Sequence, residues 1–327
     1  MNSLQVRPIS GVFPVLPTPF DASGQPDAAS MRHLVRYLLE SGVDGMTFPG
    51  VASEVAQLQP VERQALMRLV MQEVAGRVPV ISGISSPDLA TTQALAADAV
   101  ALGASALMVA APAGVKDIQG QIAYFRAIAQ TVPGVPIMLQ NVPPPAGAGL
   151  EPADVLDILR AVPAIRYVKE ETLPSGQRLT AVRSAAPPSL AGVFGGAGGR
   201  YITDELRRGA CGTMPAIELA EVHVALFRAH RSDNETAVRT LFTRMLPILN
   251  VQAVFRWSLT KYVLKRRGLI ACAGQRAAGP RLDATDQLDV DAFLHDLRDL
   301  LLPEVTLQRC TATAPDVPAQ KAGHGAP

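Results

Sequence analysis

Short apolar runs return through this chain every twenty to thirty-five residues, and helical patterns separate them. In the helical stretches apolar residues recur three or four positions apart, as at Met31, Leu34, Val35 and Leu38, which is typical of an amphipathic helix. The eight runs are residues 11–16, 45–48, 78–81, 106–110, 136–139, 165–168, 191–194 and 211–214. Strand and helix alternating eight times predict a (β/α)8 TIM barrel, an α/β fold.

The chain continues after the eighth run with more helix than one crossover needs, over residues 219–230, 235–267 and 290–302. We therefore predict a barrel over residues 8–232 and a C-terminal helical region over 233–303. Residues 304–327 are predicted to be a disordered tail, because from Thr311 onward the chain turns to Ala, Pro, Gly and Thr without periodicity. The lone Trp257, beside an apolar stripe in residues 251–263, is interpreted as packing.

Composition limits the class of partner. Hydrophobic residues make up 48% of the chain and charged residues 18%, which favours a large core over disorder. The net charge is +1 with scattered basic residues, so we expect no nucleic-acid partner and no membrane surface. The most apolar stretch, residues 94–113, is broken by Asp98 and Gly103, which argues against a membrane span. A small neutral or anionic metabolite is the expected partner.

The cysteines and histidines show no ligand spacing. Cys211, Cys272 and Cys310 are far apart and odd in number, which argues against a disulfide framework or a zinc site. No signal peptide is visible in residues 1–7, so we expect a cytoplasmic protein. The five histidines fall on predicted helices or in the tail, and we expect neither a catalytic metal nor a cofactor.

Lys169 directly follows the sixth apolar run. The chain has five lysines and twenty-five arginines, and Lys169 is the lysine that falls in a predicted strand. A desolvated lysine can lose its proton and attack a carbonyl, whereas arginine stays protonated. If Lys169 points into the barrel, strand alternation turns Glu171 inward and Glu170 away. Lys169 is therefore a candidate nucleophile, although a surface lysine paired with a glutamate is the alternative.

Active sites of such barrels lie at the carboxyl ends of the strands. After the second run, a glycine turn places the backbone N–H groups of Val51, Ala52 and Ser53 where they can bind a carboxylate. The alternative is a plain loop in which Ser53 caps the next helix. After the fifth run, Gln140 and Asn141 are expected at the barrel mouth, unless their amides only satisfy backbone groups.

The last two strands contribute small residues and a methionine. Gly195 and Gly196 open a glycine-rich loop after the seventh run. That loop can bind phosphate or leave space for any substrate. Met214, at the end of the eighth run, is assigned to substrate contact.

Four segments taken together resemble the dihydrodipicolinate synthase/N-acetylneuraminate lyase superfamily of class I aldolases. They are GVFPVLPTPF at residues 11–20, the turn at 50–54, Asn-Val-Pro at 141–143 and Val-Lys-Glu at 168–170. The resemblance covers about residues 8–300. It implies a barrel with following helices, a Schiff-base lysine at Lys169, and a homotetramer built from dimers.

The sequence departs from the family pattern at the site. Gln140 stands where most members have a proton-relaying tyrosine, and Val51 and Ala52 stand where hydroxyl residues are usual. Dihydrodipicolinate synthase itself has an arginine at the position of Pro145, and a tyrosine pair where this chain has residues 113–114. These departures argue against that synthase and resemble the 2-keto-3-deoxy sugar acid dehydratases.

Our hypothesis is that Lys169 forms an imine with the C2 carbonyl of a 2-oxo acid. The enamine derived from it then expels a C4 hydroxyl or cleaves the C3–C4 bond. Glu171 is the first choice as acid and base, with Ser53 or a water on Gln140 and Asn141 as alternatives. The competing hypotheses are a deaminase of a cyclic imino acid on the same scaffold, the synthase proper, and a non-catalytic protein that binds a 2-oxo acid.

Overall fold

The computed structural model describes residues 9–311 and contains an eight-stranded sheet in the order β1-β8-β7-β6-β5-β4-β3-β2. Neighbouring strands are parallel throughout. A parallel bridge between Val15 and Thr47 brings the first and second strands together and closes the ring. The strands are β1 (Gly11–Val12), β2 (Met46–Thr47), β3 (Val80–Gly83), β4 (Ala106–Ala110), β5 (Ile137–Asn141), β6 (Ile165–Glu170), β7 (Gly192–Gly195) and β8 (Gly212–Thr213). The predicted barrel is confirmed.

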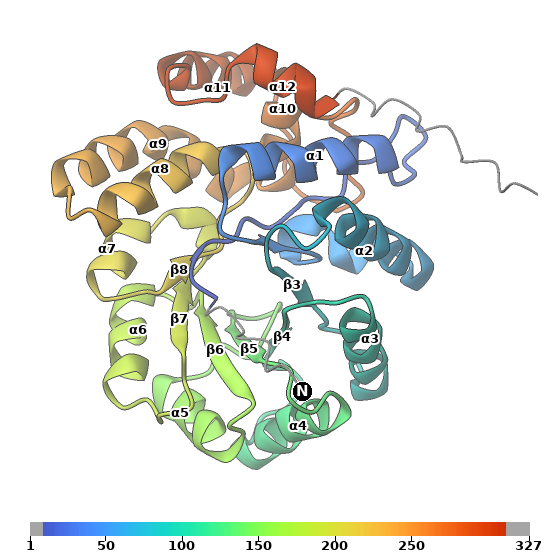
Figure 1. Ribbon diagram of the computed structural model, residues 1–327, viewed down its shortest axis with the longest axis vertical. Coiled ribbons are helices and arrows are strands. Elements are labelled where there is room, and N and C mark those ends of the chain that lie inside the picture. The colour runs from blue at the N-terminus through green and yellow to red at the C-terminus, as the bar shows by residue number, and fades with distance from the viewer. Residues whose placement is uncertain (1–8, 312–327) are drawn as a thin grey trace, which may run out of the picture.

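Helices connect successive strands and form the outer layer of the barrel (Figure 1). Asp27, Asp88 and Asp117 each begin a helix by accepting a hydrogen bond from the backbone N–H three residues on, which satisfies an otherwise orphaned donor. These outer helices are α1 (Ala28–Ser41), α2 (Pro60–Val74), α3 (Leu89–Ala101), α4 (Ile118–Thr131), α5 (Pro152–Ala161), α6 (Ser175–Ser184), α7 (Ile202–Arg207) and α8 (Ala220–Arg231). Short 3₁₀ turns η1 (Val51–Ser53), η2 (Val55–Gln57) and η3 (Ala197–Gly199) lie in the loops after β2 and β7.

The core divides into two clusters, one inside the barrel and one between the strands and the helices. Inside the barrel, Phe13 and Tyr167 both pack edge-on against Phe194, with ring centroids 5.7 and 6.1 Å apart. Tyr167 therefore faces inward, whereas its neighbour Val168 belongs to the outer cluster. Because side chains alternate along a strand, the same parity turns Lys169 into the barrel.

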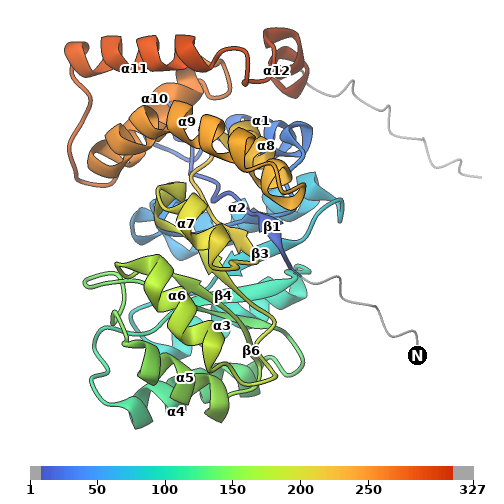
Figure 2. The ribbon, with the colours of Figure 1, turned by 90° about the vertical axis from the view of Figure 1, so that its left-hand side faces the viewer.

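Helices α9 (Glu235–Phe255), α10 (Trp257–Arg266), α11 (Ala284–Leu297) and α12 (Glu304–Thr311) form the C-terminal region. Figures 1 and 2 show them gathered beyond α8 and α1, at one side of the barrel. The single helix predicted over residues 235–267 is wrong, because the chain breaks at Arg256, where φ is 44°. A tertiary contact accompanies the break, since the Trp257 indole donates a 3.0 Å hydrogen bond to the Val51 carbonyl.

The disordered tail predicted from residue 304 is wrong over its first eight residues, which form α12. Leu307 and Cys310, one helical turn apart, are buried, and α12 packs against α1. Burial of this apolar face gives the segment order that its composition did not indicate. Residues 312–327 lie outside the described residues.

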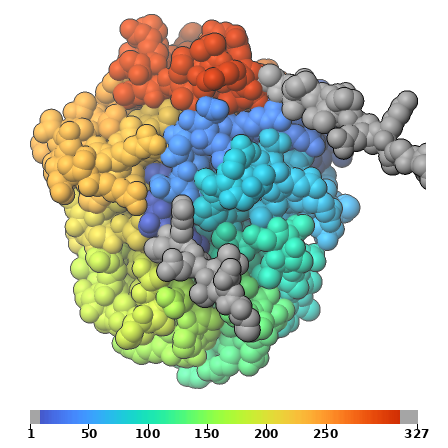
Figure 3. Space-filling model, viewed as in Figure 1, coloured from blue at the N-terminus to red at the C-terminus, as the bar shows by residue number. Residues whose placement is uncertain are grey.

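Figure 3 shows α11 and α12 covering one edge of the molecular surface. Within residues 9–311, no helix is long and apolar enough to cross a membrane.

Glu205, on α7, is a buried carboxyl with an expected effect on stability. Its side chain is 1% exposed, and it accepts a 2.7 Å hydrogen bond from the Ser175 hydroxyl. Burial raises its pKa to about 7 from 4.5. The loss of folding stability caused by burying the ionised Glu205 carboxylate is therefore absent below pH 4.5 and complete above about pH 7.

We expect Glu205→Gln to gain free energy of unfolding relative to the wild type as pH rises from 5 to 8, by up to about 3 kcal/mol. Urea unfolding at several pH values measures this difference. The exposed Glu40→Gln serves as a control. A difference that does not change with pH would contradict the prediction.

Candidate active site

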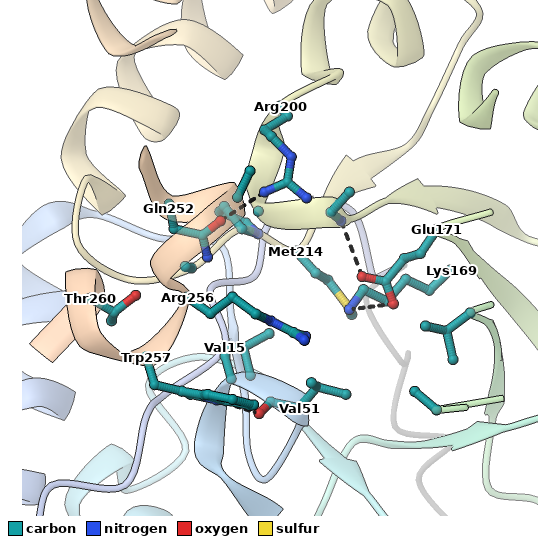
Figure 4. Close-up of a pocket in the computed structure, with 18 residues that line it drawn as sticks. Val15, Val51, Lys169, Glu171, Arg200, Met214, Gln252, Arg256, Trp257 and Thr260 are labelled. Atoms are coloured by element: carbon teal, nitrogen blue, oxygen red, sulfur yellow. Dashed lines mark hydrogen bonds and ion pairs between the residues drawn. The ribbon is translucent and has the colours of Figure 1, made fainter. Parts of the chain in front are cut away.

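A cavity of about 340 Å³ opens at the carboxyl ends of the strands. Barrel residues Lys169, Glu171 and Met214 line it, and Arg256 and Trp257 enter from the junction of α9 and α10 (Figure 4). This volume suits a small metabolite. The cavity lies at the strand ends, where the site is predicted.

Lys169 lies near the carboxyl end of β6 with its amine inside the cavity. The residue is 4% exposed, and its Nζ lies 3.1 Å from Oε2 of Glu171. In the sheet, Lys169 pairs with Gln140 of β5. Parity along the two strands thus aims the lysine, the glutamate and the glutamine at one point.

Three hydrogen-bond donors surround the Glu171 carboxylate. The Gln140 amide donates to Oε2 at 2.6 Å, and the Ala197 backbone N–H donates to Oε1 at 3.1 Å. Lys169 is the third. Burial alone would raise the pKa of Glu171, but the Lys169 charge and these hydrogen bonds hold it below its usual value. Glu171 is therefore an ionised carboxylate beside a lysine amine.

The turn after β2 contributes two lining residues whose backbone N–H groups have no hydrogen-bond acceptor among residues 9–311. These residues are Val51 and Ala52. The polar groups of Ser53, in contrast, are already hydrogen-bonded within the protein. Its N–H donates to the Gly50 carbonyl at 3.0 Å. Its fully buried hydroxyl accepts from the Gly50 N–H at 2.9 Å and donates to the Leu16 carbonyl. Its assignment to substrate binding is corrected: Ser53 shapes the turn.

Asn141 also does not reach the cavity. It is one residue beyond the inward-facing Gln140, so alternation turns it outward. Its amide donates to the Leu150 carbonyl and to Glu170, and its oxygen accepts from the Leu150 N–H at 2.8 Å. Glu170 faces outward as predicted, and burial is the main cause that raises its pKa. Asn141 therefore holds a loop in place and does not line the cavity.

Neither predicted glycine of the loop after β7 lines the cavity, which is bordered there by Ala197 and Gly198. A Cβ on Gly196 would lie 2.5 Å from Cγ of Glu171, and one on Gly195 would lie 1.8 Å from Oε2 of Glu205. Both glycines leave room for a carboxylate side chain. Their substrate-binding assignment is corrected, whereas Met214 lines the cavity as expected.

The other side of the cavity is lined by residues that no sequence pattern indicates. They include Arg200 in the loop after β7, Gln252 near the end of α9, and Arg256 and Trp257 at the helix junction. Trp257 was interpreted as packing, yet it lines this cavity and a neighbouring one of about 380 Å³. Gln140 lines that neighbouring cavity. A continuous helical pattern gave no signal for the break that aims these side chains inward.

No group of three or more His, Cys, Asp or Glu side chains in residues 9–311 is arranged to hold a metal ion. The ionisable side chains that line the cavity are Lys169, Glu171, Arg200 and Arg256. Their chemistry is that of an amine, a carboxylate and two guanidinium groups. Such a set can form an imine, move protons and bind anions.

Comparisons with known proteins agree with this fold. An L-2-keto-3-deoxyarabonate dehydratase of Azospirillum brasilense is 27% identical over 296 residues, or 89% of this chain and 96% of that protein. A 4-hydroxy-tetrahydrodipicolinate synthase of Stenotrophomonas maltophilia is 36% identical over 187 residues, which span 56% of this chain and 62% of the synthase.

Solved structures are similar over most of the chain. Dihydrodipicolinate synthase from Rhodopseudomonas palustris superposes with a TM-score of 0.81 at 28% identity, covering 88% of this chain and 98% of that one. YagE, a prophage protein of E. coli K12 solved in complex with pyruvate, gives a TM-score of 0.81 at 25% identity, covering 90% and 99%. The model of the dihydrodipicolinate synthetase family matches residues 8–295. The resemblance inferred from four short segments is confirmed, and the chain belongs to the dihydrodipicolinate synthetase family.

Proposed function

We propose that this protein is a lyase that dehydrates a 2-oxo acid of the 2-keto-3-deoxy sugar acid type through an imine on Lys169. One observation carries the proposal: a buried lysine amine lies 3.1 Å from a carboxylate, inside a cavity of about 340 Å³. The relative from A. brasilense, similar over nearly its whole length, is named as a dehydratase of this substrate class, which supports the choice.

Binding begins with the carboxylate of the 2-oxo acid. The N–H groups of Val51 and Ala52 are fixed by the turn and can donate to it, which places C2 near the lysine. Lys169 gives a proton to Glu171, and the neutral amine attacks C2. One of the two N–H protons of the adduct then moves to the C2 oxygen, which gives the carbinolamine. Glu171 returns the proton to the departing C2 oxygen, which leaves as water. The product is an iminium ion beside an ionised Glu171.

Elimination follows from the iminium ion, which withdraws electrons from C3. Glu171 takes a C3 proton, and the electron pair of that C–H bond forms the enamine. The enamine then expels the C4 hydroxyl, which takes the proton from Glu171 and leaves as water. Hydrolysis of the resulting unsaturated imine frees Lys169. Gln140 does not titrate, and its 2.6 Å hydrogen bond orients the Glu171 carboxylate for these steps.

The alternative functions either proceed through the same lysine imine or involve no reaction at all. Retro-aldol cleavage would release pyruvate, a deaminase of a cyclic imino acid would release ammonia, and the synthase proper would consume pyruvate with an aldehyde. A non-catalytic binder would release nothing. Product analysis of the purified protein on a panel of keto-deoxy acids separates these activities.

The proposal is tested by reduction with borohydride in the presence of pyruvate. We expect a permanent mass increment on the peptide that contains Lys169. Incubation with borohydride alone is the control. Absence of the adduct, or an adduct on another lysine, would refute the imine.

Glu171→Gln is expected to lower kcat about 10²- to 10⁴-fold, because the amide cannot accept the proton from Lys169 or from C3. Steady-state kinetics on the substrate identified by the panel measures the loss. The exposed Glu235→Gln serves as the matched control. Turnover that survives intact in Glu171→Gln would show that another group moves the protons.

The homotetramer and the cytoplasmic location stay predictions. Sedimentation of the purified protein measures the first.

A further inference from the structure

Arg256 places an unpaired guanidinium group in the cavity. None of the described residues, 9–311, accepts a hydrogen bond from its side chain or forms an ion pair with it. Its guanidinium carbon lies 4.8 Å from the ring centroid of Trp257. Figure 4 shows the side chain extending from the helix junction into the cavity, toward the side on which Lys169 and Met214 lie. A cation in this position is available to a ligand.

The backbone at Arg256 is bent so that its side chain points this way. Its φ of 44° and ψ of −110° lie in a region that residues with a Cβ rarely adopt, and such outliers gather at ligand-binding positions. The bend separates α9 from α10. On its far side, Trp257 is fixed to the Val51 carbonyl by its indole N–H. Stacking against this anchored ring limits the motion of the guanidinium.

A second arginine adds to the positive charge. The Nη1 of Arg200 donates to the Gln252 side chain at 2.8 Å, and both residues line the cavity. Arg200 and Arg256 carry two positive charges in addition to that of Lys169, whose charge Glu171 balances at 3.1 Å. The cavity therefore has positive charge that the pairing of lysine and glutamate does not neutralise, and it favours an anionic ligand.

We infer that the substrate carries a second anionic group, a carboxylate or a phosphate, at the end remote from its 2-oxo acid, and that Arg256 binds this group while Arg200 adds positive charge to the same cavity. The inference rests on the proposed function. The C1 carboxylate already has donors in the Val51 and Ala52 N–H groups, on the turn after β2. Arg256 comes from the C-terminal helices, and the planar fork of its guanidinium matches a carboxylate or phosphate.

The test measures the concentration at which each 2-oxo acid gives half-maximal borohydride trapping on Lys169. Two matched pairs are compared: 2-oxoadipate with 2-oxohexanoate, and 2-keto-3-deoxy-6-phosphogluconate with 2-keto-3-deoxygluconate. The first pair differs by a terminal carboxylate and the second by a phosphate. Pyruvate, which has no remote group, completes the panel.

We expect the wild type to prefer the dianionic member of at least one pair by about tenfold or more, as for a charged hydrogen bond. Arg256→Gln should bring that ratio close to one, and Arg256→Lys should keep part of it. Arg239→Gln, at an exposed position on α9, is the matched charge control. Arg256→Gly, which tolerates a positive φ, gives a second test if the glutamine variant folds poorly.

Three outcomes would overturn the inference. In the first, the wild type traps both members of both pairs equally well, which leaves the proposed imine intact. In the second, Arg256→Gln loses pyruvate trapping as strongly as dianion trapping, which would place the C1 carboxylate on Arg256. In the third, no 2-oxo acid is trapped on Lys169, and the proposed function fails together with the inference.

Discussion

Lys169→Ala is expected to lose turnover by at least about four orders of magnitude and to lose all borohydride trapping, because no other lysine of residues 9–311 lines the cavity to supply the imine nitrogen. The Lys169 amine lies 3.1 Å from Glu171 within the cavity. Lys261, the other buried lysine among the described residues, is bound to Glu54 in a separate ion pair. Kinetics and mass spectrometry of the reduced protein measure the two losses.

Lys169→Arg separates the chemistry from the charge. Arginine can keep an ion pair with Glu171, but it stays protonated and forms no imine. We expect this variant to fold like the wild type and to be as inactive as Lys169→Ala. The exposed Lys265→Ala is the control for the loss of a lysine. An alanine variant that kept measurable turnover above the background would refute the Schiff-base mechanism.

Lys261→Met is expected to lower the free energy of unfolding by about 3–5 kcal/mol, because it leaves the buried Glu54 carboxylate without its cation. Both residues are fully buried side chains. Lys261 also donates to the Gly274 carbonyl at 2.8 Å and lies 4.2 Å from the Phe20 ring centroid. The other oxygen of Glu54 accepts from the backbone N–H groups of residues 276 and 277. The pair thus joins the turn after β2 to the C-terminal region.

Chemical denaturation and thermal unfolding measure this effect, with a decrease in Tm of about 5–10 °C expected. Adding Glu54→Gln should recover part of the loss, because the buried charge is then removed with its partner. Lys265→Met lies one turn along α10 on an exposed position, and it should change stability by less than about 0.5 kcal/mol. A single Lys261→Met variant as stable as the wild type would contradict the prediction.

The barrel and its lysine were predictable because they depend on local periodicity. The eight apolar runs mark the strands, and parity within β6 places Lys169 and Glu171 on one face. The same parity, applied to β5, would have excluded Asn141, because adjacent residues of a strand face opposite sides. Gln140 and Asn141 cannot both enter the barrel.

The remaining errors come from contacts between distant parts of the chain. Ser53 follows Gly50 in a turn that suits a binding loop, but its hydroxyl is engaged by Leu16, thirty-seven residues earlier. The break at Arg256 has no glycine or proline to mark it. Trp257 reaches Val51 across 206 residues of sequence. Such contacts form only in the folded chain, so local sequence patterns do not predict them.

Because of the bend between α9 and α10, the residues proposed for chemistry and those proposed for ligand selection come from different parts of the chain. Lys169 on β6 and Glu171 directly after it hold the amine and the carboxylate, whereas Gln252, Arg256 and Trp257 on the opposite wall belong to helices added after the last strand or to their junction. Substitutions in those helices can therefore alter which molecules are accepted while the lysine chemistry stays intact. Proteins with this architecture can therefore change their substrate specificity through substitutions in a short stretch of the C-terminal helices.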